Sequence, residues 1–458
     1  MSIITRFAPS PSGKLHLGGA RTAMLNYLFA QSCNGIFKLR IENTDKLRTT
    51  EESIVSILDS LNWLGLKTSE KIILQSDNIK RHRSVAFKLL DKDLAYKCFH
   101  TEEELKILKK KNSKISSIWR NKKKTEHPES KKYVIRMKIP KSNKIEINDM
   151  IQGKITVNSS EIDDFIILRS DLQPTFLLSS AIDDHDMKIS HIIRGDDHLT
   201  NTFRQFYIFK FLSDKLPFFG HISLILDSEG KKLSKRNEIT SIEDFRNAGY
   251  LRESLINYLL RLGWSHKNKE IFSLKEAIKL FNIKNIGKSP AKTDIKKLNF
   301  LNNYYLKNLS KDYVFKLLLK KIDENKFVIN DSQKQIIFKL LETLIERCTT
   351  LNDLFTSSLF IFSSKEKKFS SYEKEIIQEF KVLEKEIIQI FKNLKSWNSE
   401  GINNGIKKFI DKKKINYKFI GQPLRLLLTY KLNSPPVPLI MEALGKDEVI
   451  KRIELVDS

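Results

Sequence analysis

The first 64 residues carry two alternating hydrophobic patterns. Residues 3–8 form a short β-prone run, and turn-forming residues follow at 9–13. From His16 onward apolar side chains recur every three or four positions, the period of a helix with one buried face. These positions are Ala20, Ala23, Met24, Tyr27 and Leu28. Residues 37–42 alternate as a strand, and residues 50–64 are again helical in pattern. This order predicts parallel strands joined by a right-handed crossover.

A polar segment interrupts this α/β pattern. Residues 98–132 are dense in Lys, Ser and Asn, which is typical of an exposed insertion. Three strand-like segments follow, at residues 133–139, 155–157 and 165–168. The α/β pattern then returns with a strand at 191–194, a helix at 202–212 and a strand at 221–226.

The last third of the chain has only helical spacing, because no strand pattern persists from Asp312 onward. Asp331 is a candidate N-cap for one of these helices. Its apolar positions are Ile336, Ile337, Leu340, Leu341 and Leu344. Residues 371–397 repeat the pattern. The sequence therefore predicts an α/β fold class: a Rossmann-like parallel-sheet domain with an α+β insertion, followed by a mainly α-helical region.

The charge balance adds a candidate partner. The 458 residues include 81 Lys and Arg against 55 Asp and Glu, a formal net charge of +26. Such an excess favours a polyanionic partner, with nucleic acid ahead of an acidic membrane. A genome rich in Lys, Ile and Asn codons would also raise the charge everywhere, so composition alone leaves both explanations open.

Cysteine usage and the N-terminus bear on location. Cys33, Cys98 and Cys348 are widely spaced and form no paired motif, which favours a reducing compartment. Residues 1–8 lack the pattern of a signal peptide, and no apolar run reaches the ~20 residues of a membrane helix. We expect a soluble cytoplasmic protein that does not bind membranes.

The first candidate chemical motif is PSPSGKLHLGG at residues 9–19. It lies between a strand and a helix, where α/β folds bind nucleotides, and free N–H groups at a helix start attract phosphate. Gly18 and Gly19 let adenine or a phosphate approach the backbone. His16 supplies a donor to a phosphate oxygen. By itself the segment could equally be an ordinary turn before a helix.

The second motif is KKLSKR at residues 231–236, preceded by a DSEG turn. Lysines on a mobile loop can close over a triphosphate and neutralise charge that develops at the α-phosphate. A lysine-rich run alone is more often a solvated surface loop. Together the two motifs predict that His16 and Lys235 converge on one nucleotide.

HLGG paired with KLSKR resembles the two signature motifs of class I aminoacyl-tRNA synthetases. Three further segments resemble bacterial glutamyl-tRNA synthetases: TRFAPSPSG from Thr5, RIENTD from Arg40 and IRGDDH from Ile193. The resemblance is continuous over residues 2–310 and weaker beyond, as in GQPLR at 421–425.

The resemblance implies roles for individual residues. ATP would be bound by His16, Gly18, Gly19 and Lys235, and catalysis would depend on His16, Lys232 and Lys235. The glutamate pocket would comprise Arg6, Ala8, Ser10, Glu42, Phe176, Ser180 and Arg194. In it, Arg6 and Arg194 would hold the side-chain carboxylate in the bidentate manner of guanidinium groups, and Glu42 would pair with the α-ammonium. The alternatives are a structural salt bridge of Arg194 with Asp196 or Asp197, and a surface charge for Glu42.

Two positions depart from the family pattern. Phe176 stands where a tyrosine is usual, and loss of that hydroxyl could weaken glutamate recognition by about 1 kcal/mol. Some relatives carry a zinc site in the insertion, but here Cys98 and His100 have only the distant His127 to join them. Structural zinc needs four N or S ligands, so we expect no zinc and only Mg²⁺ on the ATP phosphates.

The resemblance also implies a division of the chain. Residues 1–97 and 176–231 would be the two halves of the catalytic domain, and 98–175 the insertion that binds the tRNA acceptor end. Residues 232–311 would be a stem-contact region carrying the KLSKR loop, and 312–458 a helical anticodon-binding region, split near 367. Arg347 resembles an arginine that contacts the third anticodon base. A helix-ending surface arginine is an equal alternative.

The expected function is a monomeric glutamate–tRNA ligase with tRNA-Glu, glutamate and ATP as partners. Whether tRNA-Gln is also charged is left open. Glutaminyl-tRNA synthetases share the catalytic layout but read the anticodon with β-barrels, and glutamyl-queuosine tRNA synthetases lack an anticodon module. A non-catalytic RNA-binding paralogue would show decay of the two signature motifs, and both are intact.

Overall fold

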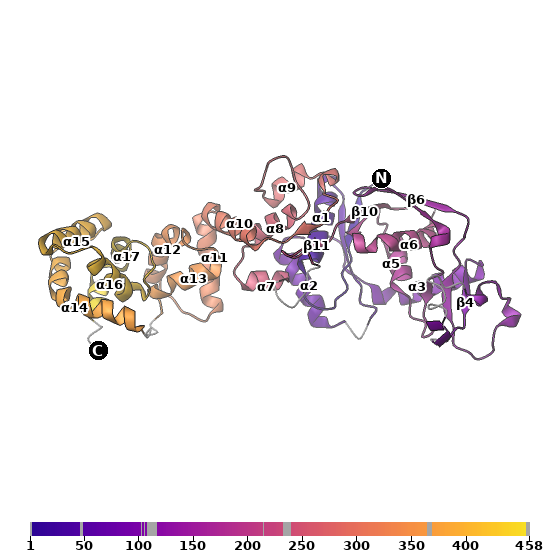
Figure 1. The fold of residues 1–458 in the computed structure, drawn as a ribbon, viewed down its shortest axis with the longest axis horizontal. Coiled ribbons are helices and arrows are strands. Elements are labelled where there is room, and N and C mark those ends of the chain that lie inside the picture. The colour runs from indigo at the N-terminus through magenta and orange to yellow at the C-terminus, as the bar shows by residue number, and fades with distance from the viewer. Residues whose placement is uncertain are drawn as a thin grey trace. The chain divides into compact units, whose positions relative to one another are not determined.

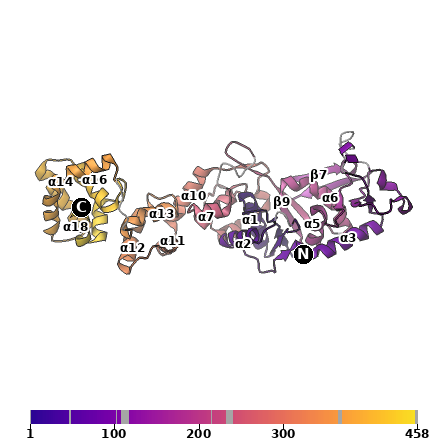
Figure 2. The ribbon, with the colours of Figure 1, turned by 90° about the horizontal axis from the view of Figure 1, so that it is seen from below.

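The computed structural model describes residues 2–45, 49–101, 103–104, 106–107, 117–213, 215–231, 240–363 and 369–454. The chain forms two compact units. Unit 1 comprises Met1–Asn247 and Leu255–Ile295, and unit 2 comprises Ala248–Ser254 and Lys296–Ser458. Among the described residues the strands all belong to unit 1, and unit 2 is built from helices (Figure 1 and Figure 2).

The N-terminal part of unit 1 is a parallel sheet. β1 (Ile4–Phe7) pairs with β2 (Ile36–Ile41), which pairs with β3 (Ile73–Leu74). α1 (Leu17–Ser32) makes the crossover between β1 and β2. The side chains that α1 buries completely include Ala20, Ala23, Met24 and Leu28. The predicted βαβ unit is confirmed, and the helical period identified its buried face.

A second parallel pair completes the centre of unit 1. β9 (His191–Gly195) pairs with β10 (Phe218–Ile222), and α6 (Leu199–Leu212) connects them. β9 also lies beside β1, since the backbone N–H of Ser190 donates to the Ile4 carbonyl at 3.0 Å. α5 (Phe176–Asp186) packs against α6. The carboxyl ends of β1 and β9 therefore meet at one edge.

The insertion is an antiparallel sheet with an added hairpin. β5 (Val134–Met137) pairs with both β4 (Ala95–Cys98) and β8 (Ile166–Leu168), and β6 (Lys144–Asp149) pairs with β7 (Gly153–Asn158). The strands predicted at 133–139, 155–157 and 165–168 are confirmed. β6 was not predicted, although its residues alternate between exposed and buried. Its charged and polar side chains left only two isoleucines to mark the buried face.

Other elements of unit 1 are α2 (Glu51–Trp63), α3 (Ile79–Asp91), α7 (Ile242–Asn247), α9 (Leu274–Leu280) and the parallel pair of β11 (Ile225–Leu226) and β12 (Ala291–Lys292). α8 (Arg252–Arg261) and α10 (Ile295–Asn308) contain points where the chain passes from one unit to the other.

The described part of 312–454 contains helices and no strand, as predicted. They are α11 (Lys311–Glu324), α12 (Asp331–Ile345), α13 (Leu351–Ser358), α14 (Ser371–Lys392), α15 (Ser399–Lys413), α16 (Lys418–Thr429), α17 (Val437–Leu444) and α18 (Lys446–Glu454). None of the helices in the described ranges is both long enough and apolar enough to span a bilayer.

The predicted cap of α12 is wrong by one residue. Asn330, not Asp331, is the N-cap: its side chain accepts from the Gln333 N–H at 2.8 Å, and the Gln333 side chain accepts from the Asn330 N–H at 3.0 Å. This reciprocal capping box satisfies two free donors. Asp331 instead pairs with Lys334 on the first turn.

Candidate active site

A cavity of about 600 Å³ lies at the carboxyl ends of β1, β2 and β9. Sheet edges of this kind are where open α/β folds bind ligands. The residues from the sequence prediction that line it are Arg6, Ala8, Ser10, Gly18, Gly19, Glu42, Phe176, Ser180 and Arg194. These residues line one cavity although Arg6 and Arg194 are 188 positions apart in the sequence.

His16 does not line this cavity but stands directly before α1, two residues from Gly18. Its segment is joined to the residues that follow the second motif. The Leu17 N–H donates to the Thr240 carbonyl and the Ile242 N–H to the Leu15 carbonyl, both at 2.9 Å. Lys232 and Lys235 lie outside the described residues, so their predicted position beside His16 stays a prediction.

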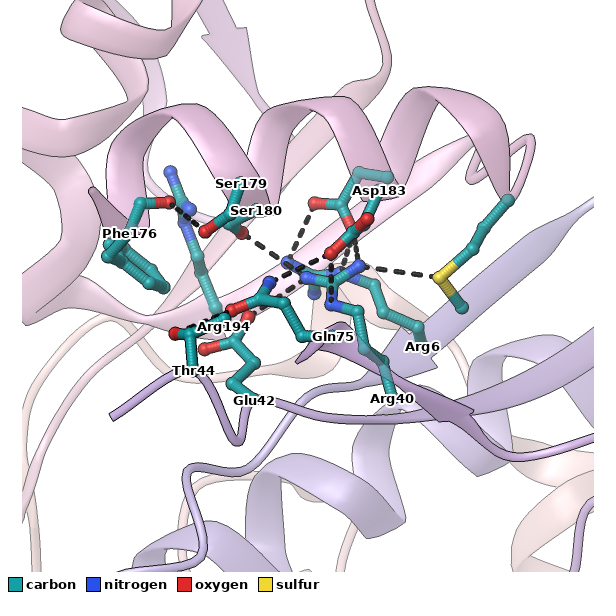
Figure 3. Close-up of polar contacts among 12 residues, drawn as sticks. Arg6, Arg40, Glu42, Thr44, Gln75, Phe176, Ser179, Ser180, Asp183 and Arg194 are labelled. Carbon is teal, nitrogen blue, oxygen red and sulfur yellow. Dashed lines mark hydrogen bonds and ion pairs between the residues drawn. The ribbon is translucent and has the colours of Figure 1, made fainter. Parts of the chain in front are cut away.

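A buried ion network supports the cavity from behind, and Figure 3 shows its members Arg6, Arg40 and Glu42. Asp184 on α5 accepts from Arg6 Nε at 3.0 Å and from Arg40 Nη1 at 2.5 Å. Arg40 Nη2 also donates to Glu42 Oε1 at 3.0 Å and to Ser180 Oγ at 3.2 Å. Burial alone would raise the pKa of Asp184, but Arg40 and Arg6 outweigh it and hold that pKa below its ordinary value.

Glu42 is buried at the end of β2, with 8% of its surface exposed, so the alternative of a solvated surface charge does not hold. Burial raises the pKa of its carboxyl, and Arg40 opposes this only in part. Glu42 lines the cavity. Among the described residues, Arg40 is the only charged side chain that donates a hydrogen bond to its carboxylate.

Arg194 is a buried cation of the cavity whose side-chain hydrogen bonds go to groups other than carboxylates. Its guanidinium donates to Gln205 Oε1 at 2.9 Å, to Thr202 Oγ1 at 2.7 Å and to His221 Nε2 at 3.4 Å. Among the described residues no carboxylate lies within ion-pair distance of it, so the alternative salt bridge with Asp196 or Asp197 is not formed. Burial, and then the charge of Arg6, lower the pKa of Arg194 to about 9. Asp184, Glu42 and Asp197 lie near enough to oppose this lowering in part, but none of them forms an ion pair with the guanidinium.

Phe176 closes the cavity at the start of α5. Its ring centroid lies 5.4 Å from that of His198, with the two planes tilted by 44°. Burial and the charge of Arg194 lower the pKa of His198, which favours the neutral imidazole. Phe176 and His198, which line the cavity together with Arg194, therefore present an uncharged wall to it.

Comparison with known proteins identifies the family. Residues 2–300 match the catalytic domain of tRNA synthetases class I (E and Q), and residues 306–456 match the anticodon binding domain. Glutamate–tRNA ligase 1 of Gluconobacter oxydans is 40% identical, over 100% of this chain and 98% of that protein. Glutamate–tRNA ligase 2 of Rickettsia prowazekii is 41% identical, over 99% and 98%. The chain belongs to the glutamate–tRNA ligase family of class I tRNA synthetases.

Solved structures agree with this synthetase family over the whole length. The crystal structure of a glutamate tRNA ligase from Elizabethkingia meningosepticum in complex with its amino acid has a TM-score of 0.86 and 32% identity, covering 99% of both chains. That of the glutamate-tRNA synthetase from Elizabethkingia anophelis has a TM-score of 0.83, covering 100% of both.

The insertion of this synthetase packs the side chains that were weighed as zinc ligands against other partners. Cys98 Sγ lies 3.6 Å from Ser117 Oγ, His100 Nδ1 lies 3.1 Å from Glu104 Oε2, and the His127 ring lies 5.2 Å from the Phe99 ring. In the part of the chain that the structure describes, no three His, Cys, Asp or Glu side chains are grouped to hold a metal ion.

The helical unit of the synthetase has its own cavity, of about 720 Å³. Arg347 lines it and donates through Nη1 to Asn433 Oδ1. The aromatic residues that also line it are Phe327, Phe355, Phe360 and Tyr430. An exposed guanidinium beside aromatic rings can hydrogen-bond and stack with an unpaired base.

The sequence did not reveal the residues that support the cavity from behind. Arg40, Asp184, Thr202 and His221 are all fully or almost fully buried. A weak signal existed for two of them, because Arg40 interrupts the largely apolar strand β2 and Asp184 closely follows the apolar pair Ala181 and Ile182 of α5. Charges in such positions are rarely buried without a partner.

Proposed function

We propose that this protein is a glutamate–tRNA ligase that serves protein synthesis. In the first step an α-carboxylate oxygen of glutamate bonds to the α-phosphorus of ATP while the bond to pyrophosphate breaks. In the second, a ribose hydroxyl of the 3′-terminal adenosine of tRNA-Glu attacks the glutamyl-adenylate and AMP leaves. No side chain acts as a nucleophile, so the rate depends on positioning and charge stabilisation.

The observation that carries the proposal is the charge arrangement of the cavity. The guanidinium of Arg194, which pairs with no carboxylate among the described residues, suits a side-chain carboxylate, and the buried carboxylate of Glu42 suits an α-ammonium. Arg6 donates from Nε and Nη2 to Asp184 and from Nη1 to the Ile193 carbonyl, and because a guanidinium has five N–H groups, two remain for the substrate. Ala8, Ser10, Phe176 and Ser180 form the walls.

The nucleotide would lie at the start of α1. Gly18 and Gly19 line the cavity there, and the first N–H groups of a helix attract phosphate. His16 would donate to a phosphate oxygen, and Lys232 and Lys235 would stabilise the charge that develops during adenylate formation. Mg²⁺ would enter with the ATP phosphates as part of that substrate. The hydrogen bonds of Leu15 and Leu17 with residues 240–242 support this arrangement.

The tRNA would be read by the helical unit, with Arg347 at the third anticodon base and segment 98–175 at the acceptor end. The helices of residues 311–454 argue against a glutaminyl-type β-barrel module, and the match of residues 306–456 to an anticodon binding domain argues against a glutamyl-queuosine enzyme. We further assign the protein to the cytoplasm, since three free cysteines fit a reducing compartment, and we assign a monomer from the family resemblance.

Aminoacylation of purified tRNA-Glu and tRNA-Gln with radiolabelled glutamate, run side by side, tests the proposal. We expect ATP-dependent charging of tRNA-Glu, and the second tRNA decides whether charging is restricted to it. Isothermal titration with a glutamyl-adenylate analogue separates an enzyme from a binding paralogue. Tight analogue binding without charging of either tRNA would contradict the proposed reaction.

A further inference from the structure

We infer that Thr202, His221 and Asp149 form a positioning relay that holds Arg194 in the glutamate cavity through a neutral imidazole. The inference rests on the proposed function, because Arg194 is there the group that recognises the substrate's side-chain carboxylate. The three relay residues come from separate elements: Thr202 from α6, His221 from β10 and Asp149 from the end of β6.

The hydrogen bonds of Arg194 fix the direction of the relay. A guanidinium only donates, so Thr202 Oγ1 must accept from Arg194 Nη2 at 2.7 Å. The Thr202 hydroxyl hydrogen is then free to point to His221 Nε2, 3.0 Å away. Arg194 Nε approaches the same His221 nitrogen at 3.4 Å. With a donor on each side, Nε2 must present its lone pair.

Asp149 fixes the other side of the imidazole. His221 Nδ1 lies 2.6 Å from Asp149 Oδ2, so the ring carries its proton on Nδ1 and donates it to the carboxylate. Asp149 Oδ1 accepts from the backbone N–H groups of Ile151 at 2.9 Å and Gln152 at 2.8 Å. The carboxylate is thus held rigidly, and both Asp149 and His221 are buried.

The relay orients Arg194 without placing a charged group directly against its guanidinium. A carboxylate placed directly on Arg194 would orient the guanidinium well but would neutralise it and compete with an anionic substrate. Here the Asp149 charge is separated from Arg194 by the imidazole ring, and the atoms that touch the guanidinium are uncharged. Arg194 is therefore oriented while its charge remains available to the substrate.

A matched pair of variants at Thr202 tests this role. Thr202→Val replaces the hydroxyl by a methyl group, whereas Thr202→Ser retains the hydroxyl and loses the methyl group. We expect Thr202→Val to raise the KM for glutamate about 10-fold, since hydrogen bonds to charged groups are the stronger ones. The KM for ATP should stay within about twofold. Thr202→Ser should recover most of the lost glutamate affinity. Equal KM values for glutamate in the two variants would overturn the relay.

A spectroscopic measurement reads the protonation of His221 in the unaltered enzyme, and a variant is used only to assign its signal. In ¹⁵N spectra of the nine histidines, the ring of His221, assigned as the signal lost in His221→Gln, should be neutral with its proton on Nδ1. A proton on Nε2, or a doubly protonated ring at pH 7, would overturn the inference. If wild-type enzyme charges no tRNA with glutamate, the proposed function fails; if it charges normally and these readouts fail, only the relay does.

Discussion

Arg6 and Asp184, 178 residues apart in the chain, face each other through two parallel hydrogen bonds of 3.0 and 3.2 Å. The pair joins β1 to α5 behind the cavity. Asp184 is shared, because Arg40 donates to the same Oδ1 atom. One buried carboxylate therefore holds two guanidinium groups in place, and its loss would leave both without that counter-ion.

Asp184→Asn should strongly destabilise the protein. Removing one partner of a buried ion pair costs about 3–5 kcal/mol in the free energy of unfolding. Asp186→Asn is the matched control on the same helix, since Asp186 pairs with Arg81 at the surface and should cost less than about 1 kcal/mol. Urea denaturation measures both. Similar losses in the two variants would show that burial of the Asp184 network adds nothing.

The same carboxylate should make stability depend on pH. Arg40 and Arg6 keep the pKa of Asp184 in the folded protein below the value of about 3.9 for an unfolded aspartate. Its stabilisation is therefore complete above that value and is lost as the pH falls below it, because the unfolded chain then binds the proton more readily. The difference in unfolding free energy between wild type and Asp184→Asn should be constant above about pH 5 and should shrink as the pH falls below about 3.9. A difference that also stays constant below that pH would contradict this origin.

Lys235→Ala should lower the rate of glutamate activation by roughly 100-fold or more, the effect of removing one strong transition-state contact. Pyrophosphate exchange in the presence of tRNA measures this step. Lys231→Ala is the control, because Lys231 pairs with Glu229 at the surface with 77% of its side chain exposed, and its rate should not change. A wild-type rate in Lys235→Ala would remove that lysine from the mechanism.

Phe176→Tyr should improve glutamate binding. The ring lines the cavity, and a restored hydroxyl that reaches the substrate is worth about 1 kcal/mol, or roughly a fivefold lower KM for glutamate. The KM for ATP serves as the internal reference. No change, or a weaker affinity for glutamate, would mean that the ring does not reach the amino acid.

Arg347→Ala should raise the KM for tRNA-Glu by about 10-fold and leave the KM for glutamate and for ATP unchanged, because loss of a base contact costs about 1–3 kcal/mol. Lys339→Ala is a control on α12, since Lys339 forms a surface pair with Glu442. If both variants behave like wild type, Arg347 is a helix-ending surface arginine.

The hydrophobic period of the sequence was sufficient for β1, β2 and β9, for α1 and for the helical last third, because each of these elements buries one continuous face. It missed the two-residue strands β3 and β12, and the single strand predicted at 221–226 is in the structure the end of β10 and the separate β11. The period was insufficient for β6, whose two isoleucines alternate with charged and polar residues. Asn330 and Asp331 are adjacent and both side chains can cap a helix, so the sequence alone did not decide which of them is the N-cap of α12. The cavity residues came from the resemblance. Their supports, Asp184 and His221, contact partners 178 and 72 residues away, and no local pattern encodes such pairs.

The hairpin of β6 and β7 packs on β10, where the Met150 N–H donates to the Phe219 carbonyl at 2.8 Å. Asp149, the last residue of β6, lies within the segment expected to bind the end of the tRNA. Excising that segment to obtain a minimal activating enzyme would strip His221 of its proton acceptor. Removing the segment would therefore also weaken selection of the amino acid. A shortened enzyme would lack the carboxylate that holds His221 and, through it, Arg194.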